Sequence, residues 1–396
     1  MRISTNGLYQ QGLAALMARQ TQLAKTQQEM ATGSKLTRAA DDPAAAAQAQ
    51  TLDHALGQLD QYAKSAGLLQ NRLQAQEGAL TDATDYLNRV RELTVQANTS
   101  TLSPDDRKVI ASEIRHLRAS LLAVANRDDG NGRSLFAGQV DGVVPFADTA
   151  GVVAYNGDDG RNLIDVAPGM TVADADPGSD VFMRIRSGDG TLRGTAGAAN
   201  AGTGVLQTAS VNDPSAWAGR TLTLEFTSPT EWRVLDANGE VANGTYAEGD
   251  TLKVAGVQAR ITGTPAAGDV FTLQSAPRQD IFATLEGLAD ALDAPAITAQ
   301  QKTVLSNALG SALSDVARAQ EHFTAIRATT GSRMASIDQS SDDRAETQLS
   351  LKATLSGLRD VDYAEASARF SLQLTAIEAA QKTMLRVQSL SLFDKL

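Results

Sequence analysis

The sequence predicts an α+β fold: an elongated antiparallel helical bundle, or coiled-coil rod, formed by both chain ends, with a central all-β insert domain. Two observations predict it. Residues 129–280 hold 22 of the 32 glycines and seven of the ten prolines, so turns gather in the middle of the chain. The flanks 1–128 and 281–396 are instead rich in Ala, Gln and Leu, which form helices readily.

Composition excludes several classes of protein. With 396 residues, 42% of them hydrophobic and 20% charged, we expect two or three ordered domains. The net charge is −11 and no Lys/Arg cluster occurs, which argues against nucleic-acid binding. The absence of cysteine excludes disulfides and thiolate metal sites. No apolar run approaches the roughly 18 residues of a membrane span, and we expect no cleaved secretory signal peptide.

The amino-terminal flank predicts three helices. The first ends near Gly33, and its apolar stripe consists of Tyr9, Leu13, Leu16, Leu23 and Met30. Asp42-Pro43 caps the second helix, which carries seven heptads from Leu52 to Ala97, a pattern typical of a coiled coil. Ser103-Pro104 starts the third. The expected rod seam comprises Leu52, Leu59, Leu73, Leu80 and Leu87 of the second helix and Ile110, Ile114, Leu117 and Leu121 of the third.

The carboxyl-terminal flank repeats this pattern. A short helix is expected over Ile281–Leu292, and Thr298 with Gln301 forms a capping box for a long helix reaching about Gly357. Asp362 starts the last helix, whose apolar residues occupy more than one face, as in helices that are buried on several sides. The residues expected to act in assembly there are Phe370, Leu374, Ile377, Met384, Val387 and Leu390.

The insert has the alternation of β-strands. Thr221–Phe226 places three apolar side chains on one face, and Asp236–Gly239 is a hairpin-turn signal. Val181–Ile185 is expected to be a further short strand. The expected domains are terminal polymerisation helices at 1–42 and 362–396, a helical rod at 43–132 and 278–361, a β-hairpin segment packed on the rod at 133–186, and an outward all-β domain at 187–277.

The residues show no catalytic constellation. The three histidines, His54, His116 and His322, lack metal-ligand or triad spacing, and the paired acids adjoin helix starts, where capping explains them. Glycine-rich stretches lack the Lys-Ser/Thr of a phosphate loop. We therefore expect no enzyme, no cofactor and no metal site.

The chain ends favour polymer formation. Residues 1–51 carry five basic and three acidic side chains, and residues 361–396 carry four of each, so little charge repulsion opposes close packing between subunits. Two terminal helices alone would leave much of their apolar surface wet. Because isolated helices are marginal in water, we expect these ends to become ordered on assembly.

Several short motifs follow one another in a specific order along the chain. The amino-terminal motifs are Ile3–Asn6, Gly33–Leu36 and Ala40–Pro43; the others are Ser134–Gly138, Asp176–Phe182, Gly268–Phe271, Gln279–Phe282, Asp360–Glu365 and the ending Leu390–Leu396. Their order resembles the bacterial flagellin superfamily, and within it the hook-associated protein 3 (hook–filament junction) family. The Ala/Gly-rich segment 195–210 departs from the pattern, because it matches no motif of the family.

The resemblance implies a structural adaptor of the flagellum that joins hook to filament by helix–helix polymerisation of its termini. The implied partners are further copies in a ring, hook-associated protein 1, flagellin, and an export chaperone near the carboxyl end, with no nucleic acid and no membrane. The implied location is extracellular, on the bacterial flagellum, after type III export. Two alternatives are a flagellin filament subunit and a secreted carbohydrate-binding or enzymatic β module on a helical stalk.

Overall fold

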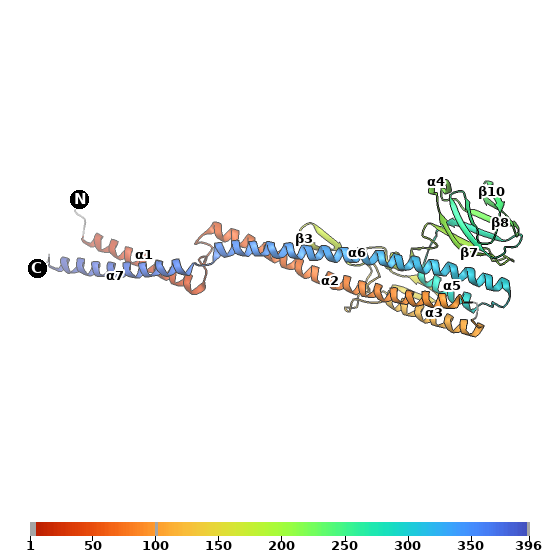
Figure 1. The fold of residues 1–396 in the computed structure, drawn as a ribbon. Coiled ribbons are helices and arrows are strands. Elements are labelled where there is room, and N and C mark those ends of the chain that lie inside the picture. Colours follow the sequence, from red (N-terminus) through yellow and green to blue (C-terminus); the bar gives the residue numbers. More distant parts are fainter. Residues whose placement is uncertain (1–4, 100–101, 394–396) are drawn as a thin grey trace. The chain divides into compact units, whose positions relative to one another are not determined.

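The computed structural model describes residues 5–99 and 102–393, with the side chains of residues 5, 6, 8 and 387–393 outside that description. Helices occupy both flanks of the chain, and antiparallel strands occupy its middle (Figure 1). This arrangement confirms the expected fold class. The α-helices are α1 (Thr5–Thr32), α2 (Pro43–Ala97), α3 (Pro104–Ala125), α4 (Pro214–Trp217), α5 (Ile281–Asp293), α6 (Ala299–Arg359) and α7 (Tyr363–Phe393).

The chain divides into two compact units, and the division falls inside α2 and α6. The terminal unit joins residues up to Lys64 with residues from Gln339 on, and the central unit is Ser65–Asp338. The sequence instead placed boundaries at helix ends, near residues 42 and 361, so its domain limits stay a prediction.

The helices begin where capping residues allow them to. The Asp42 carboxylate accepts hydrogen bonds from the backbone amides of Ala44 and Ala45, which have no partner within the helix. Ser103 and Asp106 form a reciprocal capping box at α3. Thr298 and Gln301 do the same before α6, as their spacing predicted.

In the central unit α2 and α6 run antiparallel, and α3 and α5 complete the helical core. Polar pairs fix the direction: Gln70 donates to Asp338 (3.1 Å), Arg327 to Glu77 (2.8 Å) and Gln320 to Asn88 (2.7 Å). The fully buried side chains of this core include Leu80, Leu87, Val90, Ile114, Leu121, Phe282, Leu285, Val316 and Phe323. The heptad of α2 is therefore buried by helices from both flanks.

A buried polar cluster lies between α2 and α6. Gln76 has no exposed surface, and its amide nitrogen donates to Asp176 (3.0 Å) and to Thr330 (2.9 Å). Arg333 donates to both oxygens of the Asp176 carboxylate, at 3.0 and 2.8 Å. Burial raises the pKa of Asp176, but the hydrogen bonds and charge of Arg333, with Gln76 and Arg161, outweigh it and hold that pKa below its usual range.

Two β-hairpins cover the helices of the central unit. One is formed by β1 (Phe146–Thr149) and β2 (Val152–Tyr155), and the other by β3 (Leu163–Ala167) and β4 (Met170–Ala173). In the second hairpin, Val166 and Val172 pack in one cluster with Leu73 of α2 and Ile337 of α6.

The strand expected at Val181–Ile185 is wrong. Ser179–Met183 forms a π-helical turn, and only Ile185–Arg186 is strand β5. Alternation would send Val181 and Phe182 to opposite faces, whereas both are fully buried. Phe182 is the centre of an aromatic cluster, with edge-to-face contacts at 5.1–5.6 Å between ring centroids and tilted contact with a fourth ring. Its partners are Phe136, Phe146, Phe282 and Phe323.

The β domain of the central unit consists of two antiparallel sheets that share one core. The first sheet has the order β10-β9-β8-β13-β6 and the second β11-β12-β7. The strands are β6 (Leu192–Ala196), β7 (Val205–Val211), β8 (Leu222–Ser228), β9 (Glu231–Asp236), β10 (Gly239–Thr245), β11 (Thr251–Val254), β12 (Val257–Thr262) and β13 (Val270–Ser275). Both Trp217 and Trp232 lie in this core, and their indole N–H groups donate to backbone carbonyls. They are therefore structural, which removes the support for a sugar-binding platform.

A buried carboxylate organises the unassigned segment 195–210. Asp269, 1% exposed, accepts hydrogen bonds from the backbone amides of Ala201, Gly202 and Ala266 at 2.7–3.3 Å. Gly202 is required there, because a Cβ would lie 2.4 Å from the Ala266 nitrogen. Residues 197–204 of this segment thus form a loop wrapped around Asp269, and the rest of the segment belongs to strands β6 and β7.

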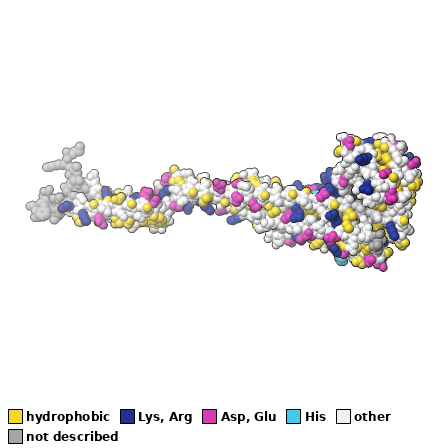
Figure 2. All heavy atoms as spheres, in the orientation of Figure 1, with side chains coloured by type: hydrophobic (Ala, Val, Ile, Leu, Met, Phe, Trp, Pro, Cys, Tyr) yellow, Lys and Arg dark blue, Asp and Glu magenta, His cyan; other side chains and the backbone are white. Residues whose placement is uncertain are grey.

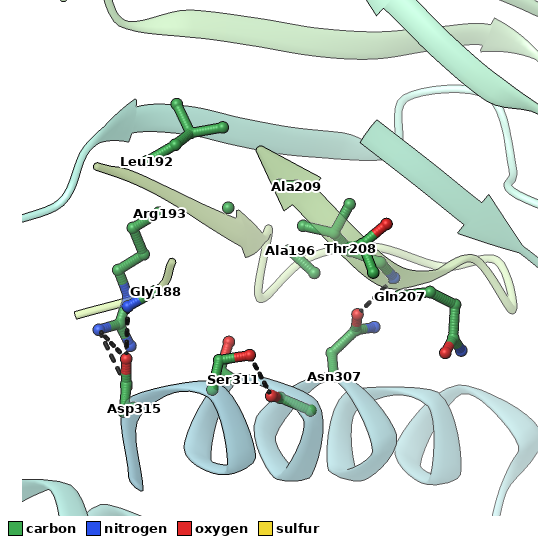
Figure 3. A pocket seen from close by; sticks show the side chains of 14 residues that line it. Gly188, Leu192, Arg193, Ala196, Gln207, Thr208, Ala209, Asn307, Ser311 and Asp315 are labelled. Carbon is green, nitrogen blue, oxygen red and sulfur yellow. Dashed lines mark hydrogen bonds and ion pairs between the residues drawn. The ribbon is translucent and has the colours of Figure 1, made fainter. Parts of the chain in front are cut away.

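The β domain contacts α6 through small side chains and a few polar groups (Figure 3). Arg193 pairs with Asp315 at 3.0 Å, and the Asn307 carbonyl oxygen accepts from the Leu206 amide at 2.9 Å. The cavity left between the two surfaces is only about 60 Å³. It has room for little more than water, so this contact is a packed joint and no ligand site.

Leu73→Ala and Leu80→Ala should each lower the free energy of unfolding by about 2–5 kcal/mol, because both side chains are fully buried. Chemical denaturation measures this. Leu68→Ala on the same helix is the control, since Leu68 is 70% exposed and should cost little. Losses below half a kcal/mol for both core variants would contradict the buried seam.

Replacing residues 190–276 with a short Gly-Ser link should leave the helices folded. The chain enters and leaves the β domain at adjacent points, since the Ser187 amide donates to the Pro277 carbonyl at 3.0 Å. Circular dichroism at a helical wavelength during heating is the measurement. Loss of the cooperative helical transition would show that the β domain is part of the helical core.

Asp176→Asn should lower the free energy of unfolding by about 3–5 kcal/mol at pH 7, because Arg333 would keep a buried charge without its partner. Since the folded pKa is depressed, the carboxylate stabilises the fold above the unfolded pKa, near 4, and this contribution disappears as pH falls through the folded pKa. The difference between parent and variant should therefore narrow below about pH 4. Asp165→Asn, at an exposed position nearby, is the control; a difference independent of pH would contradict the account.

Candidate assembly interface

Helices α1 and α7 form an antiparallel pair in the terminal unit (Figure 1). At one end the Val361 amide donates to the Gly33 carbonyl (3.0 Å), and the Lys35 backbone amide donates to the Arg359 carbonyl (2.8 Å). Further along, the Arg19 guanidinium donates to the Ala376 carbonyl (3.4 Å). Gly33 has φ +71°, the left-handed conformation that ends a helix at low cost only for glycine. A Cβ there would also lie 3.2 Å from the Tyr363 hydroxyl, so Gly33 both ends α1 and admits α7.

The seam between the two helices is narrow. On α7 only Ala366 and Ile377 are buried hydrophobic residues among the described side chains, and on α1 no described hydrophobic side chain is fully buried. The predicted stripe residues Leu13, Leu16, Leu23, Met30, Phe370 and Met384 are half-buried. Two helices packed only on each other cover one stripe apiece, so their other apolar faces stay in contact with water.

Large apolar side chains are exposed on both helices of the pair. Leu372 is 72% exposed, Leu385 65% and Met17 56%; Tyr9 and Leu374 are exposed as well. Figure 2 shows apolar side chains gathered along this helix pair. Exposed apolar side chains gathered in this way are a common feature of protein–protein interaction surfaces.

The seam also contains an incompletely paired polar group. Glu29 is 5% exposed, yet its nearest cation, Arg369, lies 3.8 Å away, which is too far for a hydrogen bond. Neither the Glu29 Oε2 atom nor the Gln373 Oε1 atom has a hydrogen-bond partner. Buried polar atoms without partners cost stability, so the α1–α7 pair is weaker than its length suggests.

The predicted residues thus divide into two groups. Of the rod-seam residues, Leu52 and Leu117 are half-buried and the others are buried: Leu59, Leu73, Leu80, Leu87, Ile110, Ile114 and Leu121. Of the assembly residues, Tyr9 and Leu374 are exposed and Ile377 is buried inside the pair, while the side chains of Val387 and Leu390 lie outside the described residues. Their role in assembly stays a prediction.

The predicted assembly set omits three of the exposed residues, Met17, Leu372 and Leu385, although the sequence predicts that Leu385 stays in contact with water when the two helices have only each other. For Leu372 and Leu385 the available signal was their position off the main stripe of α7, whose apolar residues occupy more than one face. Position on a stripe does not by itself decide exposure, since Tyr9 lies on the stripe of α1 and is 44% exposed.

The part of the chain that the structure describes contains no group of three or more His, Asp or Glu side chains placed to hold a metal ion. Of the histidines, His54 and His116 are exposed, and His322 hydrogen-bonds through Nε2 to the Asp180 carbonyl. No described helix is both long enough and apolar enough to cross a membrane.

Comparison with known proteins places these helices in a family. The model of the bacterial flagellin N-terminal helical region matches residues 3–141, and that of the C-terminal helical region matches residues 313–396. The crystal structure of Xanthomonas campestris FlgL is 42% identical, covers 77% of this chain and 99% of its own, and superposes with a TM-score of 0.72. This chain belongs to the FlgL, or hook-associated protein 3, family of the flagellin superfamily.

Two other relatives agree with this FlgL membership. The flagellar junction protein FlgL from Legionella pneumophila is 25% identical, covers 79% of this chain and 100% of its own, and has a TM-score of 0.72. Flagellar hook-associated protein 3 of Salmonella typhimurium is 33% identical over 187 residues, which are 47% of this chain and 58% of that protein. The alignment therefore spans little more than half the length of this curated relative.

Proposed function

We propose that this chain is a structural adaptor of the bacterial flagellum that joins the hook, through hook-associated protein 1, to the flagellin filament. The observation that carries the proposal is the set of large apolar side chains left exposed on the α1–α7 pair. Its support from relatives is that a protein named for the hook is similar to this chain in sequence, and a protein named for the flagellar junction shares its fold. In this proposal the chain acts outside the cell, without catalysis.

The exposed residues are suited to packing against neighbouring copies in a ring. Fully burying a leucine side chain contributes about 1.5–3 kcal/mol, and several such residues from each copy would offset the entropy lost on ordering. Hook-associated protein 1 and flagellin would cover the remaining faces above and below the ring. An export chaperone would bind near the carboxyl end before type III export, which would shield the same apolar residues.

The double variant Leu372→Gln with Leu385→Gln should abolish assembly without unfolding the chain, because both side chains already face water. Purified hooks bearing hook-associated protein 1 are incubated with the chain and then with flagellin, and filaments are counted by electron microscopy. We expect filament growth with the parent chain and little growth with the double variant. The melting temperatures of the two free proteins should be the same.

Leu68→Gln is the matched control, since Leu68 is an equally exposed helical leucine in the central unit. It should support filament growth. Normal growth with the double variant would contradict the proposed surface. Growth of long filaments from this chain without flagellin would indicate a filament subunit instead of an adaptor.

A further inference from the structure

Two arginines lie directly opposite each other where the β domain joins the helical core. Strand β5 (Ile185–Arg186) pairs antiparallel with β14 (Arg278–Gln279), and the register sets Arg186 against Arg278. Directly opposed residues of an antiparallel pair share one face, with Cβ atoms about 4.5–5.5 Å apart, and like charges there repel. Ile185, the neighbour of Arg186, is buried, so the two arginines occupy the outward face.

No described carboxylate within 4 Å balances these two charges. Nearby arginines have their own partners: Arg184 pairs with Asp159 and Asp180, and Arg318 with Glu321. Asp189, the remaining acid in this area, accepts hydrogen bonds from two backbone amides of its own turn. Arg186 and Arg278 therefore have no ion-pair partner among the described residues, although the Asp189 carboxylate keeps its negative charge near them, since its hydrogen bonds come from neutral amides.

The arginines line a hollow of about 480 Å³, within the range of small-molecule sites. Its walls come from four separate segments: the end of the π-helical turn with β5, the turn at Gly190, β14 and α6. The basic side chains that line it are Arg184, Arg186, Arg278, Arg318 and His322, and the acidic ones are Asp189 and Glu321, of which Glu321 pairs with Arg318. An anion bound in the hollow would relieve the repulsion between Arg186 and Arg278.

We propose that this hollow binds a phosphomonoester group carried by a small polar molecule. A phosphomonoester bears close to two negative charges at neutral pH, so it attracts the two arginines more strongly than a carboxylate, which bears one. Its three terminal oxygens accept hydrogen bonds from planar guanidinium groups on both strands at once. The ligand would tie β5 to β14 at the base of the β domain. This site goes beyond the adaptor role and uses none of the assembly residues.

Isothermal titration calorimetry of the full-length chain with glucose 6-phosphate at low ionic strength tests the proposal. We expect saturable binding, at least tenfold weaker binding in the double variant Arg186→Gln with Arg278→Gln, and at least tenfold weaker binding of glucuronate, which has one charge. Arg260→Gln is the matched control, because Arg260 is an exposed strand arginine without an ion pair, and it should bind like the parent.

A second arm distinguishes a soluble ligand from a lipid headgroup: flotation with phosphatidylcholine vesicles that contain phosphatidic acid. Vesicle binding that is lost in the double variant, without binding of glucose 6-phosphate, would assign the phosphomonoester to a membrane. Removing the like-charge pair should also leave the melting temperature unchanged or higher, which separates loss of binding from unfolding. Absence of binding in both arms, equal binding by the double variant, or equal affinity for glucuronate would overturn the proposal.

Discussion

The antiparallel pairing of helices from the two flanks of the chain is the constraint on which the rest of the structure depends. Within each compact unit, helices from the amino-terminal flank pair antiparallel with helices from the carboxyl-terminal flank, as the Asn88–Gln320 and Gly33–Val361 contacts show. Because the insert lies between the outgoing and the returning helices, its first and last residues must meet. The Ser187–Pro277 hydrogen bond marks that place, so the β domain is connected to the helices through two adjacent points of the chain.

The two units differ in how completely they cover their apolar surface. In the central unit, hairpins, α3 and α5 surround the α2–α6 seam, and residues such as Leu87 have no exposed surface. In the terminal unit the described residues of α1 and α7 pack on each other along one narrow seam. This arrangement leaves Leu372 and Leu385 exposed to water and Glu29 without a hydrogen-bonded cation. The difference explains how one chain can hold a stable core and also carry a surface that is completed by assembly.

Local signals made much of the fold predictable. The sequence alone shows the helix end at Gly33, the helix cap at Asp42-Pro43 and the heptad that contains Leu73 and Leu80, because each is a pattern of residues close together in the chain. The helical turn at Phe182 was not predictable, because its aromatic partners come from four distant segments and their packing overrides local strand propensity. The same holds for the candidate sites. The outward position of Leu372 depends on how α1 and α7 pack together. The Arg186–Arg278 pair depends on the register between two strands that are distant in the sequence.

Hydrogen exchange of backbone amides, measured by mass spectrometry on the free chain and on the chain assembled at hook ends, tests the central claim most directly. In the free chain, amides of α1 and α7 should exchange much faster than those of α2 around Leu80, because their helices lack a covered core. After assembly, exchange in α1 and α7 should slow markedly while that around Leu80 stays the same. Equal, strong protection of α1, α7 and the Leu80 region in the dilute free chain would contradict the account.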